Sequence, residues 1–311
     1  MSAPEHAGRL IFLDLGAARG TGRVLSATPE GKDIQVLASG ISSLPDGVQV
    51  DTRPGKGQIY VTCMGHSTST NDGYLARAAG DGTGVEVIVK EGVTFTPKQL
   101  VIDTTTDRLY WSDREGMRVF RCGLDGSNVE ALICNGVTDE DRKDNSKHCV
   151  GVSVDVKRGL LYWTQKGASK GQQGRIFRAN IDIPAGESAS ARTDIQTLYA
   201  HLPEPIDLEL DVATQTLYWT DRGDPPLGNT LNRADVSSEL DPSAAPKGPS
   251  KDTIIAAKFH EAIGLSLDLP GRRAFVADLN GSVYTVDLDS GKKETLIEDA
   301  GTVTGIVYCE G

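Results

Sequence analysis

Two carboxylic acids and two amides occupy equivalent places in a strand that recurs along this chain of 311 residues. Gln99 and Asp207 share one place in that strand, and Gln49 and Glu209 share a place two residues further on. A carboxyl group can donate or accept a proton, and an amide N–H can donate a hydrogen bond to a developing negative charge. If the strands surround one axis, these four side chains are the best candidates to line a channel. The alternative is that they bind buried water or the ends of neighbouring strands.

Histidines and two aromatic residues near the recurring strands are further candidates. Histidine can form hydrogen bonds or transfer a proton near neutral pH. The histidines in question are His66, His148, His201 and His260. For each of them the alternative is an ordinary surface loop residue. Phe95 and Phe259 lie just before recurring strands, where they would supply an apolar wall or cap the contact between repeats.

Three near-copies of one phrase define the elements that must position these residues. The copies are Leu-Tyr-Trp-Ser-Asp at 109–113, Leu-Tyr-Trp-Thr-Gln at 161–165 and Leu-Tyr-Trp-Thr-Asp at 217–221. Each copy follows an alternating apolar segment that ends in Asp, at 100–103, 152–155 and 208–211. A period of roughly 50 residues is typical of a repeat architecture. The unit is therefore a strand, a short turn, the Tyr-Trp strand and further strands.

Weaker copies extend the repeat to six units. Residues 48–51 lead to 59–62 and residues 265–268 lead to 274–278, whereas 10–14 match a second strand with no first strand before it. The missing strand stands at 305–308, and a unit completed from both termini predicts a closed ring. Four short strands in each unit predict an all-β, six-bladed β-propeller forming a single domain over 1–311, rather than an open β-sandwich. The predicted blades span 304–308 with 9–38, then 47–90, 98–134, 150–200, 206–257 and 263–298.

Alignment of the units shows which positions are structural. Where Gln99 and Asp207 stand, the other four units have Gly, which allows strands to crowd near the axis. The second strand ends in Asp at positions 14, 113, 221 and 278, which predicts a repeated structural hydrogen bond. Cys63 and Gln165 replace this Asp and each precedes a long loop, so we expect both to face the pocket.

Loop lengths indicate which face carries the site. The entrance face, as we name it, carries the loops into the first strands and the loops between second and third strands. Its loops are unequal: 64–72, 166–174 and 222–229 are long, those near 115 and 280 are short, and 135–148 is the longest. Unequal loops on a rigid scaffold predict a walled pocket on the entrance face, and harmless drift in length is the alternative. Insertions at 184–194 and 237–252 are expected to be surface loops on the opposite face.

Composition narrows the classes of partner. A net charge of −11 argues against nucleic acid, and no apolar run approaches the ~20 residues of a membrane span. Residues 1–6 do not begin a signal peptide, so we expect a cytoplasmic protein with reduced thiols, although Cys134 and Cys149 could pair under oxidation. The sequence contains no dinucleotide fingerprint, phosphate loop or Cys-x-x-Cys zinc spacing, so neither a cofactor nor a bound metal is expected.

The Tyr-Trp-Thr-Asp phrase resembles the class B repeat of the low-density-lipoprotein receptor. The match continues into the third strands, at 118–121 with 124–127 and at 175–180, and it spans almost the whole sequence. The resemblance implies the propeller fold. Receptor members bind protein ligands and are flanked by disulfide-rich modules, which this sequence does not contain.

In length and closure the sequence is more similar to stand-alone fungal propellers of natural-product pathways, some of which are hetero-Diels–Alderases. This resemblance implies a cofactor-free cyclase that joins a tropolone-derived ortho-quinone methide to a humulene-type terpene, both small molecules. Its cavity would hold diene and alkene in a reactive geometry. Candidates for the donor to the developing oxyanion are Gln99, His148, His201 and Lys98. The acid–base group that helps to expel water from a hydroxymethyl precursor would be Asp207 or Glu209.

Two other functions remain open. A calcium-dependent hydrolase or lactonase needs several oxygen ligands on the axis, and Asp207, Glu209, Gln49 and Gln99 offer a partial set. A protein-binding module could use the acidic run 139–141 in the loop into the fourth blade to hold a basic partner.

Overall fold

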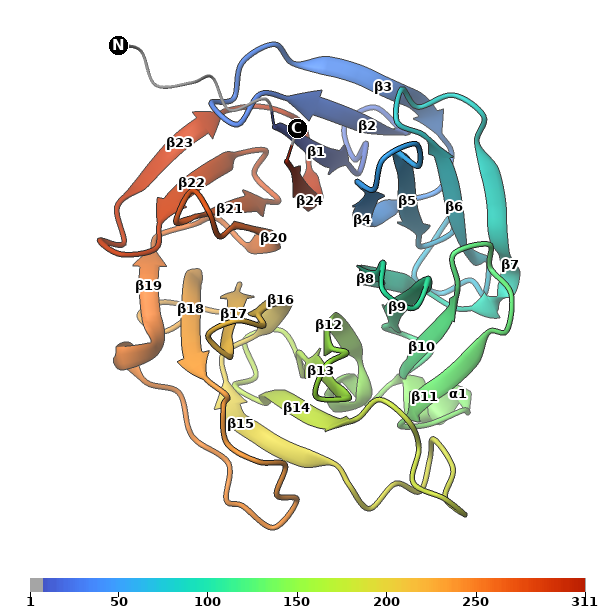
Figure 1. Ribbon diagram of the computed structural model, residues 1–311, viewed down its shortest axis with the longest axis vertical. Coiled ribbons are helices and arrows are strands. Elements are labelled where there is room, and N and C mark those ends of the chain that lie inside the picture. The colour runs from blue at the N-terminus through green and yellow to red at the C-terminus, as the bar shows by residue number, and fades with distance from the viewer. Residues whose placement is uncertain (1–7, 311) are drawn as a thin grey trace.

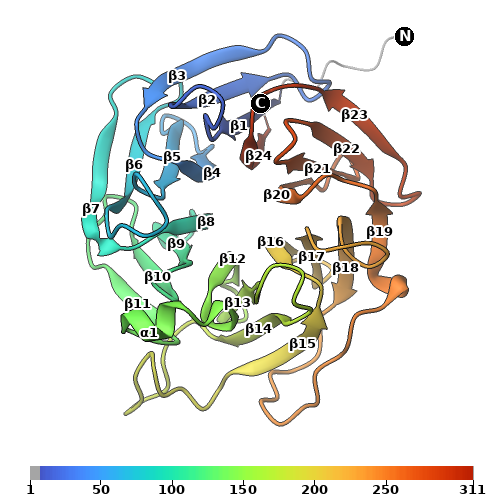
Figure 2. The ribbon, with the colours of Figure 1, turned by 180° about the vertical axis from the view of Figure 1, so that it is seen from behind.

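Six four-stranded antiparallel sheets surround one axis in the computed structural model, which describes residues 8–310 (Figure 1). Figure 2 shows the same closed ring from behind. The predicted all-β, six-bladed propeller is therefore confirmed. Residues 1–6, on which the signal-peptide expectation rests, lie outside the described part of the chain.

Each blade has its innermost strand against the central channel. From the innermost strand outward, blades one to three are β24 (Val303–Cys309), β1 (Arg9–Asp14), β2 (Gly22–Ala27), β3 (Gln35–Ile41); β4 (Pro45–Asp51), β5 (Gln58–Cys63), β6 (Gly73–Ala79), β7 (Glu86–Thr94); and β8 (Pro97–Asp103), β9 (Arg108–Asp113), β10 (Arg118–Gly123), β11 (Glu130–Cys134). Blades four to six are β12 (Cys149–Asp155), β13 (Leu160–Gln165), β14 (Gly174–Asn180), β15 (Gln196–Leu202); β16 (Pro205–Asp211), β17 (Thr216–Asp221), β18 (Thr230–Asp235), β19 (Ile254–Ala257); and β20 (Ala262–Asp268), β21 (Arg273–Asp278), β22 (Val283–Asp287), β23 (Lys293–Ile297). The longest loop holds the short helix α1 (Asp139–Arg142) and a 3₁₀ turn at Asn145–Lys147.

The ring is closed by β24, which pairs antiparallel with β1 (Figure 1). The register places Arg9 opposite Cys309 and Phe12 opposite Ile306. Ile306 and Val303 are buried in one apolar cluster with Phe12. The prediction that one blade combines both ends of the sequence is thus confirmed.

The Trp and Thr positions of the repeated phrase have different structural roles. The Trp side chains of β9, β13 and β17 are almost fully buried, and Trp111 stacks on Phe120 with 5.0 Å between ring centroids. The hydroxyl at the Thr position reaches the next blade: Thr164 Oγ1 donates to Ile206 O at 2.6 Å, and Thr220 Oγ1 donates to Ile263 O at 2.7 Å. Trp therefore fills the core, and Thr fastens one blade to its neighbour.

The terminal Asp of the phrase binds the segment that enters its own blade. Asp113 accepts the N–H groups of Phe95 and Thr96 at 3.0 and 2.8 Å. The backbone N–H groups of Thr302, Glu204 and His260 donate to the matching Asp residues of blades one, five and six. The repeated structural hydrogen bond predicted from the alignment is confirmed.

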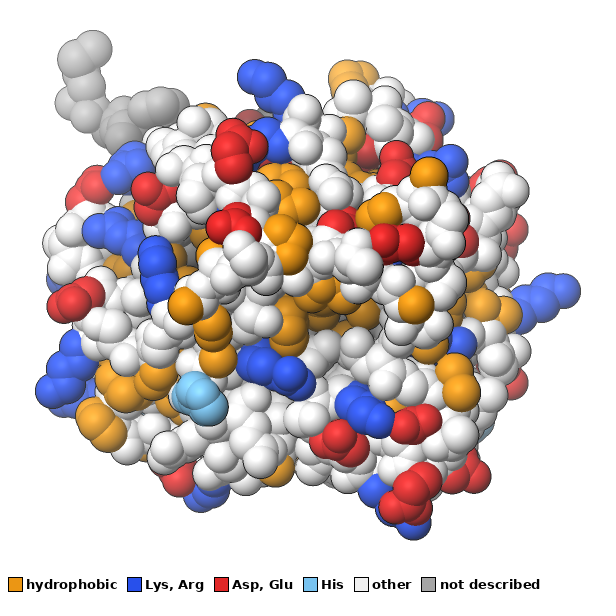
Figure 3. Space-filling view, turned by 90° about the horizontal axis from the view of Figure 1, so that it is seen from below, with side chains coloured by type: hydrophobic (Ala, Val, Ile, Leu, Met, Phe, Trp, Pro, Cys, Tyr) orange, Lys and Arg blue, Asp and Glu red, His pale blue; other side chains and the backbone are white. Residues whose placement is uncertain are grey.

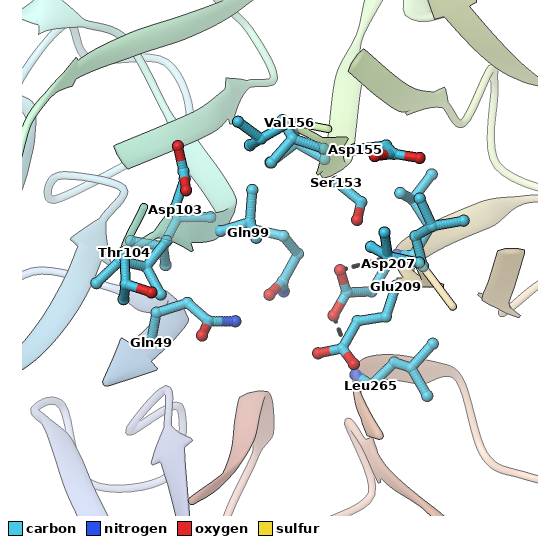
Figure 4. Close-up of a pocket in the computed structure, with 18 of the residues that line it drawn as sticks. Gln49, Gln99, Asp103, Thr104, Ser153, Asp155, Val156, Asp207, Glu209 and Leu265 are labelled. Carbon is cyan, nitrogen blue, oxygen red and sulfur yellow. Dashed lines mark hydrogen bonds between the residues drawn. The ribbon is translucent and has the colours of Figure 1, made fainter. Parts of the chain in front are cut away.

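Glycine in the third place of the inner strand is required by the approach of the next blade. A Cβ atom on Gly47 would lie 2.6 Å from Lys98 O, and Cβ atoms on Gly151, Gly264 and Gly305 would also meet backbone atoms of the following strand. Gln99 and Asp207 are the two residues of this column that carry a side chain, and both side chains point into the channel (Figure 4).

Gly264→Ala is therefore expected to destabilise the ring by about 1–3 kcal/mol, the usual cost of overpacking. The added methyl group would press on backbone atoms of Thr304 and Ile306, which cannot move without shifting β24. Gly248→Ala is the matched control, because a Cβ atom at that position meets nothing within 4 Å. Urea midpoints of the two variants and the wild type measure the difference; equal midpoints for both variants would contradict this account of the glycine column.

Three further observations concern the surface charge, the cysteines and the helices. Acidic and basic side chains are interspersed over the side of the ring seen in Figure 3. All five cysteines are free thiols, including Cys134 and Cys149. No helix within residues 8–310 combines the length and the apolar character needed to cross a membrane.

Candidate functional site

A cavity of about 450 Å³ occupies the central channel. Its walls come from the inner strands β4, β8, β12, β16, β20 and β24. Figure 4 shows the carboxyl groups of Asp207 and Glu209 pointing into it from one side and the amides of Gln49 and Gln99 from the other. The four polar side chains that the sequence selected as channel-lining candidates therefore meet in one cavity.

The alternation of a β-strand explains why these four residues converge. Residues two apart in a strand project to the same face, so Asp207 and Glu209 of β16 share one side of that strand. Gln99 of β8 stands at the place of Asp207 in its own blade, and Gln49 of β4 stands at the place of Glu209. Ser153 of β12 lines the cavity at the same level as Glu209.

Both carboxyl groups are fixed by backbone N–H donors. Asp207 Oδ1 accepts the N–H of Leu208 at 2.9 Å, and its Oδ2 accepts the N–H of Leu265 in the next blade at 3.0 Å. Glu209 Oε2 accepts the N–H of Leu267 at 2.9 Å. The second Glu209 oxygen, Oε1, accepts no backbone N–H group of a described residue, Ser266 interacts with the carboxyl group, and the side chain is partly accessible from the cavity. The expected alternative role, binding of a neighbouring strand, is thus also present.

Burial favours the neutral form of both acids. It raises the pKa of Asp207 to about 8, against the lowering effect of the N–H groups of Leu265 and Leu208. Burial also raises the pKa of Glu209 to about 8, and the neighbouring charge of Asp207 adds to this effect. A neutral carboxyl group is both a hydrogen-bond donor and an acceptor, so at neutral pH the cavity contains proton donors.

The amide side of the cavity is anchored by a residue that the sequence analysis did not select. Gln99 Nε2 donates to Asp46 Oδ1 at 3.2 Å, and the charge of Asp46 contributes to the raised pKa of Asp207. Asp46 also binds Lys98 Nζ at 2.5 Å. The available sequence signal was an acidic residue directly before the glycine column, where Asp46 precedes Gly47.

The cavity extends toward the face opposite to the entrance face. Its lining includes Thr104, Thr105, Val156, Lys157 and Val212, which follow the inner strands and form the turns to the second strands (Figure 4). We name this the turn face. The long loops of the entrance face do not line this channel cavity; the longest of them, 135–148, instead lines a separate cavity of about 390 Å³ between blades three and four.

Buried ion pairs explain why the cavity does not extend to the end of the channel at the entrance face. Lys98 is bound to Asp46 there, and Glu204 accepts hydrogen bonds from Lys166 at 3.2 Å and Arg222 at 2.9 Å. Burial lowers the pKa of Lys98 to about 8 in spite of Asp46. Asp46, Lys98 and Glu204 stand at or just before the starts of inner strands, Lys166 and Arg222 directly follow second strands, and together they place mutually paired charges at that end. Lys98 is consequently a partner of Asp46 rather than a cavity residue.

None of the four predicted histidines lines the cavity. His148 is buried, its Nε2 lies 2.9 Å from Arg142 O, and burial lowers its pKa. His66 is exposed and binds Asp72, which raises its pKa. His201 and His260 are exposed, on the outermost strand of blade four and in the loop before blade six. These histidines were predicted from their positions near inner strands and loops, and none of their side chains reaches the channel cavity.

The remaining residues predicted for the site do not line the channel cavity either. Phe95 is covered by the guanidinium of Arg142, and Phe259 packs edge-on against Tyr284, so both cap the interior of the ring. Cys63 is buried in an apolar cluster, where burial raises the pKa of its thiol to about 11. Gln165 lines a separate cavity of about 390 Å³ between blades three and four.

Two further acids of the cavity wall, Asp103 and Asp155, are not among the residues predicted for the site. Asp103 and Asp155 end their inner strands and line the cavity at the turn face. The recurrence of Asp after each apolar strand was the available signal, but these acids cap turns: Asp103 Oδ1 accepts the N–H of Thr105 at 2.8 Å. Within residues 8–310, no group of three or more His, Cys, Asp or Glu side chains is close enough to hold a metal ion.

The fold and this site define a six-bladed propeller whose channel holds a pair of carboxylic acids, Asp207 and Glu209. No family model matches the chain. It is 43% identical over 311 residues to a protein of Pyricularia oryzae named "Low-density lipoprotein receptor-related protein 1", covering 97% of this chain and 98% of that one. The chain belongs to this family of fungal propellers related by name to the low-density lipoprotein receptor.

A second fungal relative is longer. The "3-hydroxyacyl-CoA dehydrogenase-like protein LAM1" of Cochliobolus heterostrophus is 43% identical over 281 residues, which cover 89% of this chain and 58% of that protein. Among solved structures, the nidogen/laminin complex contains a chain with a TM-score of 0.71 and 16% identity, covering 97% of this chain and 98% of that one. TolB from Acinetobacter baumannii has a TM-score of 0.66 and 12% identity, covering 98% and 67%. These structures share the fold.

Proposed function

We propose that this chain is a cofactor-free cyclase, a hetero-Diels–Alderase that joins a tropolone-type ortho-quinone methide to a humulene-type terpene in its channel. The observation that carries the proposal is the acid pair of buried Asp207 and partly accessible Glu209, which faces the amides of Gln49 and Gln99 across one cavity. The resemblance to fungal cyclases supplies the substrate class. The dehydrogenase-like name belongs to a longer relative, of which this chain matches 58%.

The first step is loss of water from a hydroxymethyl precursor. The neutral carboxyl group donates its proton to the leaving hydroxyl oxygen as the C–O bond breaks. Its carbonyl oxygen takes the proton of the ring hydroxyl, so the products are the quinone methide and water, and the carboxyl group is regenerated. Glu209 is the better placed donor, because both oxygens of Asp207 already accept backbone N–H groups whereas Oε1 of Glu209 accepts none from the described residues.

The second step forms one C–C and one C–O bond between the quinone methide and the alkene and moves no proton. An amide N–H of Gln49 or Gln99 stabilises the negative charge that develops on the quinone-methide oxygen. The apolar parts of the inner strands confine the two partners, and such confinement contributes as much as ~7–11 kcal/mol to a bimolecular reaction. The cavity volume lies in the usual range for small-molecule sites, about 300–1,000 Å³.

The test is a cyclisation assay with chelator-treated protein, a hydroxymethyl-tropolone precursor and humulene. We expect faster formation of one stereoisomer than in the protein-free reaction, measured by chiral chromatography with mass detection. Activity that disappears with the chelator and returns with Ca²⁺ would favour a metal-dependent enzyme. A product mixture and rate identical to the protein-free reaction would contradict the cyclase proposal.

A further inference from the structure

Blade four departs from blade three at one ion pair. In blade three, Arg118 of β10 donates to Asp113 at the end of β9 at 2.9 Å. The same places in blade four hold Arg175 of β14 and Gln165 at the end of β13, which are paired in register. Arg175 Nη2 donates to Gln165 Oε1 at 2.8 Å and to the backbone carbonyl of Ser146. Blade four therefore keeps the cation of this pair and has replaced its carboxylate with a neutral amide.

The Trp residues of the two blades differ in the same way. Trp111 Nε1 donates to Thr94 Oγ1 at 3.2 Å. Trp163 occupies the equivalent place in blade four, and Ser146 stands where Thr94 stands, three residues before the inner strand. The Ser146 hydroxyl instead donates to Asp144 at 2.6 Å. As a result, Trp163 Nε1 is buried without a hydrogen-bond partner in the described part of the chain.

These groups lie on one cavity of about 390 Å³ between blades three and four. Trp163 and Phe177 stack with 5.2 Å between ring centroids, and the guanidinium of Arg175 lies over the Phe177 ring at 5.1 Å. Trp163, Phe177 and Ile195 give the cavity an apolar wall beside the cation.

The charges of the cavity leave a single positive charge without an ion pair. The other basic residues of its lining, Lys147 and Arg192, are bound to Asp141 at 2.6 Å and Asp194 at 2.7 Å. Arg175 forms no ion pair with any described residue. Asp144 is close enough to favour its charged form but is engaged with Ser146. Arg175 is thus the cation of this cavity that makes no direct ion pair with a described residue, and a ligand carboxylate could pair with it directly while Asp144 supplies only a nearby negative charge.

We propose that this cavity binds a small organic carboxylate, whose charged group is held by Arg175 and the Trp163 N–H and whose apolar body lies against Phe177 and Ile195. The ligand would supply the carboxylate that Asp113 supplies internally in blade three. The site is separate from the channel cavity, so it stands whether or not the cyclase proposal does.

The experiment measures binding of 4-phenylbutanoate by isothermal titration calorimetry, with 4-phenylbutan-1-ol as the uncharged probe. We expect the wild type to bind the carboxylate, and the alcohol to bind at least about tenfold more weakly because it cannot pair with Arg175. Arg175→Gln removes the cation, and Gln165→Asp restores the internal carboxylate of blade three. Both variants are expected to lower the affinity by about tenfold or more.

Arg118→Gln is the matched control, because it removes the equivalent cation of blade three and leaves this cavity intact. If Arg175→Gln does not fold, the Gln165→Asp variant still tests the proposal. Blade three already accommodates Asp at the equivalent place, so this variant is expected to fold. Three results would overturn the proposal: no saturable binding by the wild type at millimolar probe, equal binding of acid and alcohol, or undiminished binding by Gln165→Asp.

Discussion

Replacing Glu209 with Gln is expected to slow adduct formation from the hydroxymethyl precursor by about 10²–10⁴-fold, the usual contribution of a general acid. Gln preserves the size of the side chain and an oxygen for the N–H of Leu267, but it cannot deliver a proton to the leaving hydroxyl group. Stopped-flow absorbance of the quinone methide and chromatography of the adduct measure the two steps separately.

The control for this variant is a quinone methide generated in solution without the enzyme. The Gln variant should accelerate its cycloaddition nearly as well as the wild type, because that step transfers no proton. An equal loss in both reactions would show that the substitution damaged the cavity rather than the acid. A variant with full activity on the precursor would contradict the role of Glu209.

The pH profile distinguishes a proton donor from a merely structural acid. Since the pKa of Glu209 is raised to about 8, the donor is protonated below that pH, and the rate with the precursor should fall as the pH rises through about 8. Asp207→Asn removes a neighbouring charge that raises this pKa, so the fall should move to lower pH. A wild-type rate that stays constant from about pH 6 to about pH 10 would exclude both acids as donors.

Removal of β24 by ending the chain at residue 302 is expected to abolish cooperative unfolding. Val303, Ile306 and Val307 are buried, and burial of such side chains stabilises a protein by about 1.5–3 kcal/mol each. Their combined loss is comparable with the whole stability of a domain, about 5–15 kcal/mol. Without β24, the inner edge of β1 would also lose its pairing partner and be exposed. Thermal unfolding followed by circular dichroism measures the effect.

A circular permutant provides the control. In it, residues 303–310 precede residue 8 through a short turn, which the pairing of Arg9 with Cys309 permits, and new termini are opened in the exposed loop near residue 248. This chain keeps every strand and should unfold near the wild-type temperature. If the chain ending at 302 melted as cooperatively as the wild type, closure by β24 would not be what holds the ring together.

The fold was predictable because one signal is repeated. The Tyr-Trp-Thr-Asp phrase sets the register of the second strand in three blades, and weaker copies set it in the other three. Each predicted blade boundary lies within four residues of the observed one, the largest difference being 90 against 94. The orphan second strand at Arg9–Asp14 and the orphan first strand at Val303–Cys309 identified the closure. These patterns are local. Once the repeats are aligned, the closed ring of a propeller determines how all the strands are connected.

The site was predictable only in part. Strand alternation placed Gln99 and Asp207 in the channel, since residues at one level of the inner strands must converge. The open end was not predictable from loop lengths, because it depends on pairs that cross between blades. Lys98 meets Asp46 of blade two, and Lys166 of blade four meets Glu204 at the start of blade five. Such pairs have no periodic signature in the sequence.

Closure of blade one by strands from opposite ends of the fold also sets an order of events during synthesis. A ribosome that has completed β1, β2 and β3 must still produce all five other blades before the innermost strand of that first sheet exists. Until then the inner edge of β1 offers unpaired backbone groups to any other strand. Blade one is therefore the last sheet to be completed although most of it is made first, and we expect the nascent chain to depend on chaperones until β24 emerges.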